Sequence, residues 1–334
     1  MNLRRLLSYV LLAITGTSLM IGIKACSNPT PNQTTSSPAS TMSSAIVAGK
    51  SKININSAIL SELDKLEAQL GIPALSHKIQ ASRPYASTEE LVSKNVVSQD
   101  QFNQIKDQIT IEEIVLTGEA KDVDYITKLG LMKGHMIVAG ELLELKQPAQ
   151  AEPHLGHPVE EIYVDIEEQL AERQVPEFKQ TLIQVQDLVK SKPTDPQVTT
   201  AYDKAMTEID QALVAIPETQ RLAPNFVMQV INGLLETATA EYTAAITDGK
   251  IKEAIEYQDS RGFVIHAYDL FKTVQPKLKA DAKQVEQMNT AFVELQKAWT
   301  SPIPPATPTL PPDEVAVKVK QIEQTGTTVA NAAS

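Results

Sequence analysis

The chain has 334 residues, enough for two folded domains with flexible ends. An apolar content of 42% supports a packed core, and only 4% aromatic residues favours aliphatic helix packing over a β-sandwich. The formal charge of −11 argues against a general nucleic-acid-binding surface and favours cations as partners. The acidic excess lies in residues 112–300, with 18 basic and 31 acidic residues, whereas residues 50–111 are neutral.

The first 26 residues predict a secretory signal. Arg4 and Arg5 precede a mostly apolar run over residues 6–23, and the single cysteine, Cys26, follows. The cysteine before Ser27 resembles a bacterial lipoprotein processing site, which implies a lipidated Cys26. A plain signal peptide and an uncleaved membrane anchor remain open. Each alternative places the protein outside the cytoplasmic membrane, anchored, periplasmic or at the cell surface of a bacterium, and one cysteine allows no internal disulfide.

Small, polar, uncharged residues fill positions 27–49 and predict a flexible tether. Four short helical patterns follow in residues 50–111. Asn56 is a suitable N-cap for the first, which ends at Gly71. Ser87 with a glutamate three residues later predicts a capped third helix.

Five short stretches of residues 50–111 carry a family likeness. They are Ile55-Asn56, Leu70-Gly71-Ile72-Pro73-Ala74-Leu75, Arg83-Pro84-Tyr85, Glu90-Leu91-Val92 and Ile105-Lys106-Asp107-Gln108-Ile109. Together they resemble the helix-hairpin-helix module of exported ComEA-like competence proteins and of the extrinsic photosystem II subunit with that module.

The resemblance implies DNA binding at the first hairpin turn, with Gly71, Ile72 and Lys78 as contact residues. However, Pro73 has no N–H to donate, the second turn lacks glycine, and the module has no net charge. We therefore interpret the module as a packing or docking unit and keep DNA capture as the alternative.

Seven helical patterns with short breaks fill residues 112–300. They cover residues 123–146, 158–173, 176–190, 194–215, 224–247, 250–273 and 277–299. Pro148 and Pro153 predict a loop between the first two. Because no sustained alternating pattern indicates strands, the expected fold class is all-α, a helix-hairpin-helix module followed by an up-and-down bundle or a pair of bundles.

The composition of residues 301–334 predicts a proline-rich tail. Its first part, to Pro312, is expected to be an extended arm, Val315–Gln324 a short helix, and residues 325–334 disordered. With the hairpin module, this arm suggests a third interpretation, a scaffold that docks another envelope protein.

The bundle contains a weak internal repeat. Glu141-Leu142-Leu143, followed by His154 and His157, can be laid over Glu241-Tyr242-Thr243, followed by Glu256 and Asp259. If the repeat reflects two related halves, the two polar pairs could face each other across a pseudo-two-fold axis.

Three of the five histidines fall between Met132 and Tyr163, interspersed with glutamates. His157 precedes Glu160 by three residues and Glu161 by four, which places these side chains on one face of an α-helix. Imidazole and carboxylate groups together are typical of transition-metal sites. The predicted ligands are His135, His154, His157, Glu160, Glu161, Glu256 and Asp259. Without a cysteine in the folded part, the site would hold iron, copper or zinc through nitrogen and oxygen.

Gly156 and the His157-x-x-Glu160 spacing resemble the Gly-x-His-x-x-Glu motif of imelysin-like and iron-uptake periplasmic proteins, with the glycine one place closer. The resemblance implies that His157 and Glu160 bind metal. Gly134, inside a helical pattern beside His135, indicates close approach of another helix or a ligand. No motif for a metallopeptidase, a phosphate-binding loop or a serine nucleophile is present, so we expect binding rather than catalysis.

Overall fold

The computed structural model describes residues 52–113, 115–278 and 282–333. The described residues belong to one compact unit, which begins at Lys50. The predicted signal, Cys26 and the tether therefore lie outside the described residues. No helix in the described ranges has the length and hydropathy needed to cross a membrane.

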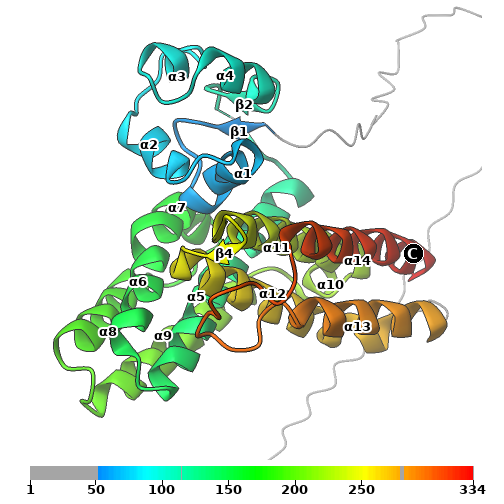
Figure 1. The fold of residues 1–334 in the computed structure, drawn as a ribbon. Coiled ribbons are helices and arrows are strands. Elements are labelled where there is room, and N and C mark those ends of the chain that lie inside the picture. The colour runs from blue at the N-terminus through cyan, green and yellow to red at the C-terminus, as the bar shows by residue number, and fades with distance from the viewer. Residues whose placement is uncertain (1–51, 114, 279–281, 334) are drawn as a thin grey trace, which may run out of the picture. The chain divides into compact units, whose positions relative to one another are not determined.

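The hairpin module consists of α1 (Leu60–Leu70), α2 (Leu75–Ala81), α3 (Glu90–Ser93) and α4 (Gln99–Ile105), closed by the parallel strands β1 (Ile53–Asn54) and β2 (Ile109–Thr110) (Figure 1). Asn56 is not the N-cap of α1, because its amide side chain is used elsewhere. Asn56 Oδ1 accepts the Tyr85 N–H at 2.7 Å, and Asn56 Nδ2 donates to the Tyr85 carbonyl at 2.8 Å. The Glu62 carboxylate accepts the Ile59 N–H and stabilises the start of α1 instead.

Two groups of helices follow the module. The N-terminal set contains α5 (Glu119–Glu144), α6 (Pro148–His157), the π-helix η1 (Pro158–Tyr163), α7 (Val164–Glu172), α8 (Lys179–Ser191) and α9 (Gln197–Leu213). The C-terminal set contains α11 (Pro224–Ala244), α12 (Ala254–Val274), the short 3₁₀-helix η2 (Gln275–Lys277), α13 (Ala282–Gln296) and α14 (Pro312–Ala333). The short helix α10 (Glu218–Arg221) connects the sets. The all-α prediction is thereby confirmed.

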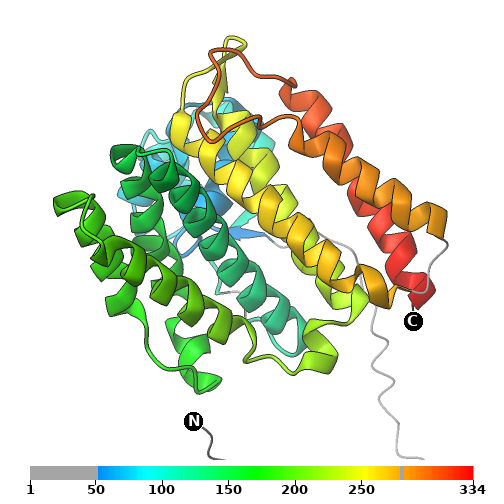
Figure 2. The same cartoon turned by 90° about the horizontal axis from the view of Figure 1, so that it is seen from below.

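Each set is a four-helix arrangement. In the N-terminal set, α6 packs against α5 and α8, and α9 packs against α5 and α8. In the C-terminal set, α11 packs against α12 and α14, and α13 packs against α14 and α12. The two sets meet where α5 lies along α12 and α11 (Figure 2), and one continuous hydrophobic core joins them.

Two glycines form the closest point of the contact between α5 and α12. A Cβ atom on Gly262 would lie 2.1 Å from the carbonyl oxygen of Gly134, and one on Gly134 would lie 2.5 Å from the Phe263 ring. The two backbones can therefore touch only because both residues lack a side chain. The prediction that Gly134 marks a close helix approach is confirmed.

The predicted loop around Pro148 and Pro153 is wrong, because residues 148–157 form α6. Pro148 occupies a first-turn position, where its missing N–H costs little, and the hydrogen bond that Pro153 forgoes is also near the helix start. Burial of Ala151 and Leu155 in the core outweighs that loss.

The predicted disorder of residues 325–334 is also wrong, because α14 continues to Ala333. Its buried residues recur at helical spacing and pack on the C-terminal set: Val315, Val319, Ile322, Gly326, Val329 and Ala330. The proline-rich stretch before it is not a free arm. Its Leu310 and Ser301 carbonyls accept hydrogen bonds from the hydroxyls of Tyr242 and Tyr257.

A small antiparallel hairpin, β3 (Ile246–Thr247) with β4 (Lys250–Ile251), connects α11 to α12. Its two turn residues, Asp248 and Gly249, have φ of 52° and 68°. This is the geometry that favours Asp-Gly in two-residue hairpin turns. The Asp-Gly pair is visible in the sequence, but without alternating apolar residues on both sides it indicates only a helix end.

Candidate metal centre

Four of the seven predicted ligands converge at the contact between the helical sets. His135, His154, His157 and Asp259 each offer one ligand atom, and these atoms all lie within 4.8 Å of one another. The histidines come from α5 and α6 of the N-terminal set, and Asp259 comes from α12 of the C-terminal set. Residues more than 100 positions apart thus share one site.

The Asp259 carboxylate lies at the centre of the group. His135 Nδ1 is 2.6 Å and His154 Nδ1 is 2.7 Å from Asp259 Oδ1, and His157 Nδ1 is 3.4 Å from Asp259 Oδ2. His135, His154 and Asp259 are buried, whereas the His157 side chain keeps 25% of its surface exposed. His157 is therefore the member of the group that faces solvent.

Local backbone features position the histidines. The crossing of Gly134 with Gly262 brings the neighbouring His135 against Asp259, one turn before Gly262 on α12. His157 is the last residue of α6, and Pro158 begins the π-helix. Pro158 has no N–H to donate to the carbonyl four residues earlier, so that carbonyl is left without its α-helical hydrogen bond. A π-helix, whose hydrogen bonds join residues five positions apart, therefore suits this position.

His154 has a hydrogen-bond acceptor at each ring nitrogen. Its Nε2 lies 2.8 Å from Gln258 Oε1, in addition to the contact of Nδ1 with Asp259. The Gln258 amide nitrogen donates to Gln150 Oε1 and to the Pro302 carbonyl, both at 3.0 Å, which fixes Gln258 Oε1 toward the histidine. Both ring nitrogens of His154 are therefore held in place by acceptors, which fixes the orientation of the ring.

The electrostatics favour an ionised Asp259 among the histidines. Burial opposes ionisation of Asp259, but the charges and hydrogen bonds of His135 and His154 outweigh it and hold its pKa well below the usual value. Burial also opposes the charge on His157, yet Asp259 raises the His157 pKa to about 9. For His135 burial dominates and lowers the pKa.

The donor set fits a transition-metal ion. Three imidazoles and one carboxylate match the nitrogen and oxygen ligands of zinc, copper and non-haem iron. Bonds of about 2.0–2.2 Å to such an ion would hold tetrahedral ligand atoms roughly 3.3 Å apart. The 3.4 Å between His157 Nδ1 and Asp259 Oδ2 already matches that separation. The distances from His135 Nδ1 and His154 Nδ1 to Asp259 Oδ1 would each have to lengthen by about 0.6 Å.

The other three predicted ligands lie outside this group of four. Glu160 is exposed. Because a π-helix has more than four residues per turn, Glu161 rather than Glu160 lies on the same face as His157. Glu161 and Glu256 are half-buried close to His157, and their charges act on it. Burial raises the pKa of both glutamates to about 7.

Two buried acids near the site were not predicted. Glu241 on α11 is 4% exposed and Asp64 on α1 is 9% exposed. Burial raises the pKa of each well above its ordinary value, and the charges of Glu161 and Glu256 add to the effect. The internal repeat aligns Glu241 with Glu141. This alignment is the one feature of the sequence that could have indicated Glu241. Nothing in the sequence of the hairpin module distinguishes Asp64 from its other acidic residues.

Arg261 does not neutralise the acids of the site. An Asp259–Arg261 or Glu256–Arg261 pair, which the sequence spacing allows, does not form, because Arg261 binds Glu141 of α5. Arg261 Nε and Nη2 lie 2.7 and 2.6 Å from the two Glu141 oxygens. This bidentate pair is a second polar link between the helical sets.

The geometry of the hairpin module argues against the DNA alternative. Gly71 has φ of 62°, as a hairpin turn requires, but the amides that follow it are already bound. Glu67 accepts the N–H groups of Ala74 and Ser76 at 2.8 and 3.1 Å. A carboxylate thus occupies the position where a DNA phosphate would bind, and Lys78 is exposed beside it while Ile72 packs on the module's core.

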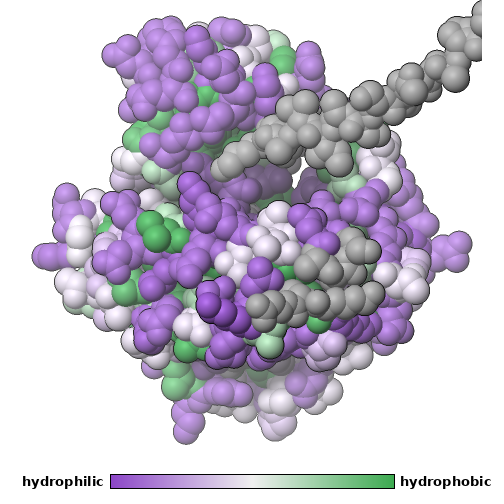
Figure 3. Space-filling model, turned by 90° about the vertical axis from the view of Figure 1, so that its right-hand side faces the viewer, coloured by the Kyte–Doolittle hydropathy of each residue, from purple (hydrophilic) through white to green (hydrophobic). Residues whose placement is uncertain are grey.

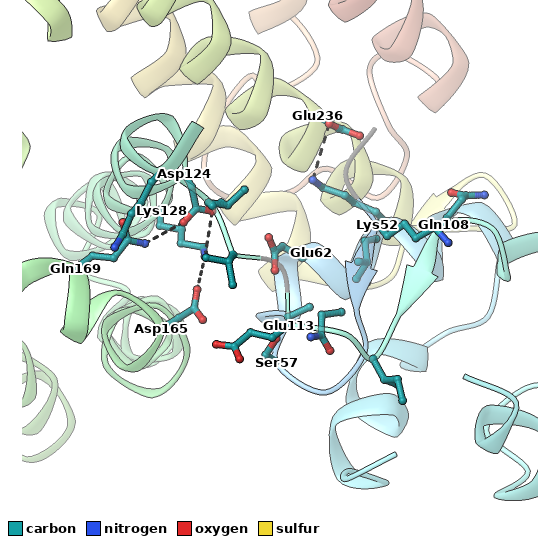
Figure 4. Close-up of a pocket in the computed structure, with 18 of the residues that line it drawn as sticks. Lys52, Ser57, Glu62, Gln108, Glu113, Asp124, Lys128, Asp165, Gln169 and Glu236 are labelled. Carbon is teal, nitrogen blue, oxygen red and sulfur yellow. Dashed lines mark hydrogen bonds and ion pairs between the residues drawn. The ribbon is translucent and has the colours of Figure 1, made fainter. Parts of the chain in front are cut away.

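A polar hollow of about 980 Å³ separates β1 and α1 from α5 and α7 (Figure 4). Lys128 lies inside it between Asp124, at 3.1 Å, and Asp165. Four lysines and seven acidic residues line the hollow, so its lining carries an excess of negative charge. The face drawn in Figure 3 is mainly hydrophilic with only scattered apolar side chains, so that face has no broad apolar docking patch among the described residues.

Comparison with known proteins gives one finding. Residues 217–333, about a third of the chain, match the model of the iron permease-associated 4-helix bundle domain. That segment contains the whole C-terminal set, with Asp259, Glu241 and Glu256, but none of the three clustered histidines. No curated protein and no solved structure matches the chain. The comparisons thus show that residues 217–333 are similar to an iron permease-associated helical domain, and they give no support to the ComEA-like resemblance.

Proposed function

We propose that this protein binds a transition-metal ion, with iron as the ion it carries, between its two helical sets. His135, His154, His157 and Asp259 act as the ligands. The observation that carries the proposal is the convergence of three imidazoles on one buried carboxylate. Such a group can be occupied by protons or by a metal ion, and its nitrogen and oxygen donors suit iron, copper and zinc.

Iron is preferred over copper and zinc because of the neighbouring segment. The C-terminal set, which supplies Asp259, resembles a domain associated with iron permeases. Affinity in the test tube does not decide the question, because Cu²⁺ and Zn²⁺ bind most nitrogen and oxygen sites more tightly than Fe²⁺. The metal content of protein isolated from cells is therefore the relevant measurement.

The test is elemental analysis of the full chain purified without chelators, repeated with His154→Ala and His157→Ala. We expect close to one equivalent of iron in the unaltered protein and a loss in both variants. His77→Ala, which removes an exposed histidine of the hairpin module, is the matched control and should retain the metal. The proposal would be refuted if His154→Ala and His157→Ala held as much metal as the control His77→Ala. It would also be refuted if the unaltered protein held no metal after anaerobic reconstitution with Fe²⁺.

The proposal places the protein in the cell envelope, attached to the membrane through Cys26. Its support is the order of basic pair, apolar run and single cysteine in residues 1–26. Mass spectrometry of the mature N-terminus should find a lipid-modified Cys26, and Cys26→Ser should move the protein from the membrane to the soluble fraction. A membrane-bound Cys26→Ser protein would point to an uncleaved anchor instead.

A further inference from the structure

The segment that follows α13 is hydrogen-bonded to the turn of α12 that carries Asp259. We call this segment, residues 299–302, the strap. Four hydrogen bonds join it to the residues on either side of Asp259: Tyr257 Oη to the Ser301 carbonyl at 3.2 Å, Gln258 Nε2 to the Pro302 carbonyl at 3.0 Å, Trp299 Nε1 to Ser260 Oγ at 2.8 Å, and Arg261 Nη1 to the Trp299 carbonyl at 2.8 Å. The strap therefore supports the part of α12 that supplies a proposed ligand.

The strap fixes which way the Gln258 amide points. Gln258 is 1% exposed, and its Nε2 donates to Gln150 Oε1 as well as to the Pro302 carbonyl. A backbone carbonyl can only accept, so turning the amide over would place its own oxygen against the Pro302 oxygen. Gln258 Oε1 must therefore face the other way, toward His154 Nε2, which lies 2.8 Å from it.

The amide oxygen determines which nitrogen of His154 can bind a metal ion. An amide oxygen only accepts, so the partners of His154 Nε2 require it to carry a hydrogen. A ring nitrogen that carries a hydrogen has no lone pair left for a metal ion. The other ring nitrogen, Nδ1, lies 2.7 Å from Asp259 Oδ1, on the side where the four proposed ligands converge. Nδ1 is therefore the nitrogen that His154 offers to the site.

We infer that Gln258 is a positioning residue of the metal site, which reserves Nδ1 of His154 for the metal ion by keeping the hydrogen on Nε2. This inference rests on the proposed function and specifies the atom of His154 that serves it. The Pro302 carbonyl acts one step further from the ion, because it fixes the amide that fixes the ring. Groups bonded to the free nitrogen of a metal-bound histidine typically change metal affinity by about 10- to 100-fold.

Gln258 also connects the two helical sets at the site. It lies on α12 next to Asp259, whereas Gln150 and His154 lie one turn apart on α6. The C-terminal set therefore supplies one ligand, Asp259, and also the group that orients a ligand of the N-terminal set. Because the strap holds Gln258 in place, a segment outside both helices contributes to the geometry of the site.

The first test reads the His154 ring directly in the unaltered protein. The full chain, labelled with ¹⁵N at histidine, is loaded with diamagnetic Zn²⁺. Long-range ¹H–¹⁵N correlation spectra then identify the zinc-bound and the hydrogen-bearing nitrogen of each ring, and the spectrum of His154→Ala assigns the signals of His154. We expect zinc on Nδ1 and hydrogen on Nε2. Zinc on His154 Nε2 would overturn the inference and leave the proposed function intact, whereas a protein that binds no Zn²⁺ would contradict both.

The second test removes the acceptor. Gln258→Met keeps the length of the side chain without an amide oxygen, so we expect Zn²⁺ affinity to fall about tenfold or more and the His154 Nε2 proton to move upfield. Gln169→Met, which removes a half-buried glutamine bonded to Asp124, is the matched control and should change neither.

Two further readouts separate positioning from packing. The emission of Trp299, the single tryptophan of the chain, reports whether the strap stays on α12, because its indole donates to Ser260. With that emission unchanged, a fall in Zn²⁺ affinity together with the upfield shift supports the inference. Either change without the other, or neither, overturns it, because Gln258 then acts through packing or does not act on the ion. If Gln258→Met fails to fold, the position of zinc on the His154 ring of the unaltered protein decides.

Discussion

The two helical sets contribute different chemistry to the same place. The N-terminal set supplies His135, His154 and His157, whereas the C-terminal set supplies Asp259. Only the C-terminal set resembles the iron permease-associated domain. Neither set contains a complete group of ligands, so the proposed site depends on the contact between them as much as on the ligands themselves. Substitutions that change one part of this contact at a time can test that dependence.

The largest effect should follow from Asp259→Asn, which removes the carboxylate contribution of the C-terminal set. The amide keeps the size of the side chain but loses the negative charge that holds the three imidazoles together. We expect Zn²⁺ affinity, measured by competition with a chromophoric chelator, to fall about 100-fold or more. Asp269→Asn, on the exposed side of the same helix, should leave it unchanged. An unaltered affinity in Asp259→Asn would mean that the ion binds elsewhere.

His266 tests the same contact further along α12. It lies two turns beyond Asp259, against Gly130 of α5, and its Nε2 has no partner among the described residues. Burial, helped by the charge of Lys133 and opposed by Asp269 and Asp210, lowers its pKa from 6.5 to about 4. The folded state thus binds fewer protons than the unfolded state between these values, and acidification destabilises the fold.

Relative to His266→Leu, the unaltered protein should therefore lose stability as the pH falls from about 6.5, with the loss complete near pH 4. The difference between the two His266 pKa values, 6.5 and about 4, corresponds to at most about 3.4 kcal/mol. Urea unfolding of both proteins across this range measures the difference. His77→Leu, which removes an exposed histidine, should show no such pH-dependent difference from the unaltered protein. Parallel pH profiles for the His266→Leu and unaltered proteins would show that His266 is solvated.

Gly262→Ala tests how closely the two sets must approach. The added methyl group would lie 2.1 Å from the Gly134 carbonyl oxygen, so α5 and α12 must move apart. We expect a loss of about 2 kcal/mol in unfolding free energy, despite the gain of about 1 kcal/mol that alanine usually gives in a helix. Gly326→Ala in α14 is the control, because its methyl group would meet only the flexible ends of Met228 and Met288. Equal stability of the two variants would rule out a tight crossing.

The same contact explains what could be predicted from the sequence. Helices α8, α9 and α11 were predictable because a proline stands at or just before each start, and α12 because the Asp248-Gly249 turn precedes it; in all four, apolar residues recur at helical spacing. Helix α6 was missed because Pro148 is tolerated only if the helix begins at that residue, and because Pro153 lies inside the helix, where proline usually breaks it. The full extent of α14 was missed because a proline-rich lead and a small-residue end resemble a disordered tail in composition alone.

The site was predictable in its residue types and not in its exact membership. A cluster of histidines in a histidine-poor chain is visible in the sequence, and the internal repeat pointed to Asp259. Glu160 lies outside the cluster because the chain forms a π-helix where the prediction assumed an α-helical period. Asp64 and Glu241 could not be recognised, because their burial arises only when the hairpin module covers α11.

The smallest effect concerns the ion pair that links the sets beside the site. Glu141→Gln removes the charge from the bidentate pair with Arg261, and the Glu141 and Arg261 side chains are 29% and 18% exposed. A double-mutant cycle with Arg261→Gln should give a coupling energy of about 1 kcal/mol, since the pair is only partly shielded from solvent. The pair Glu294–Lys297, exposed on one end of α13, should give less than about 0.5 kcal/mol. If both cycles give the same small value, the Glu141–Arg261 pair adds nothing beyond an ordinary surface contact, and the shared hydrophobic core with its glycine crossing holds the helical sets together without it.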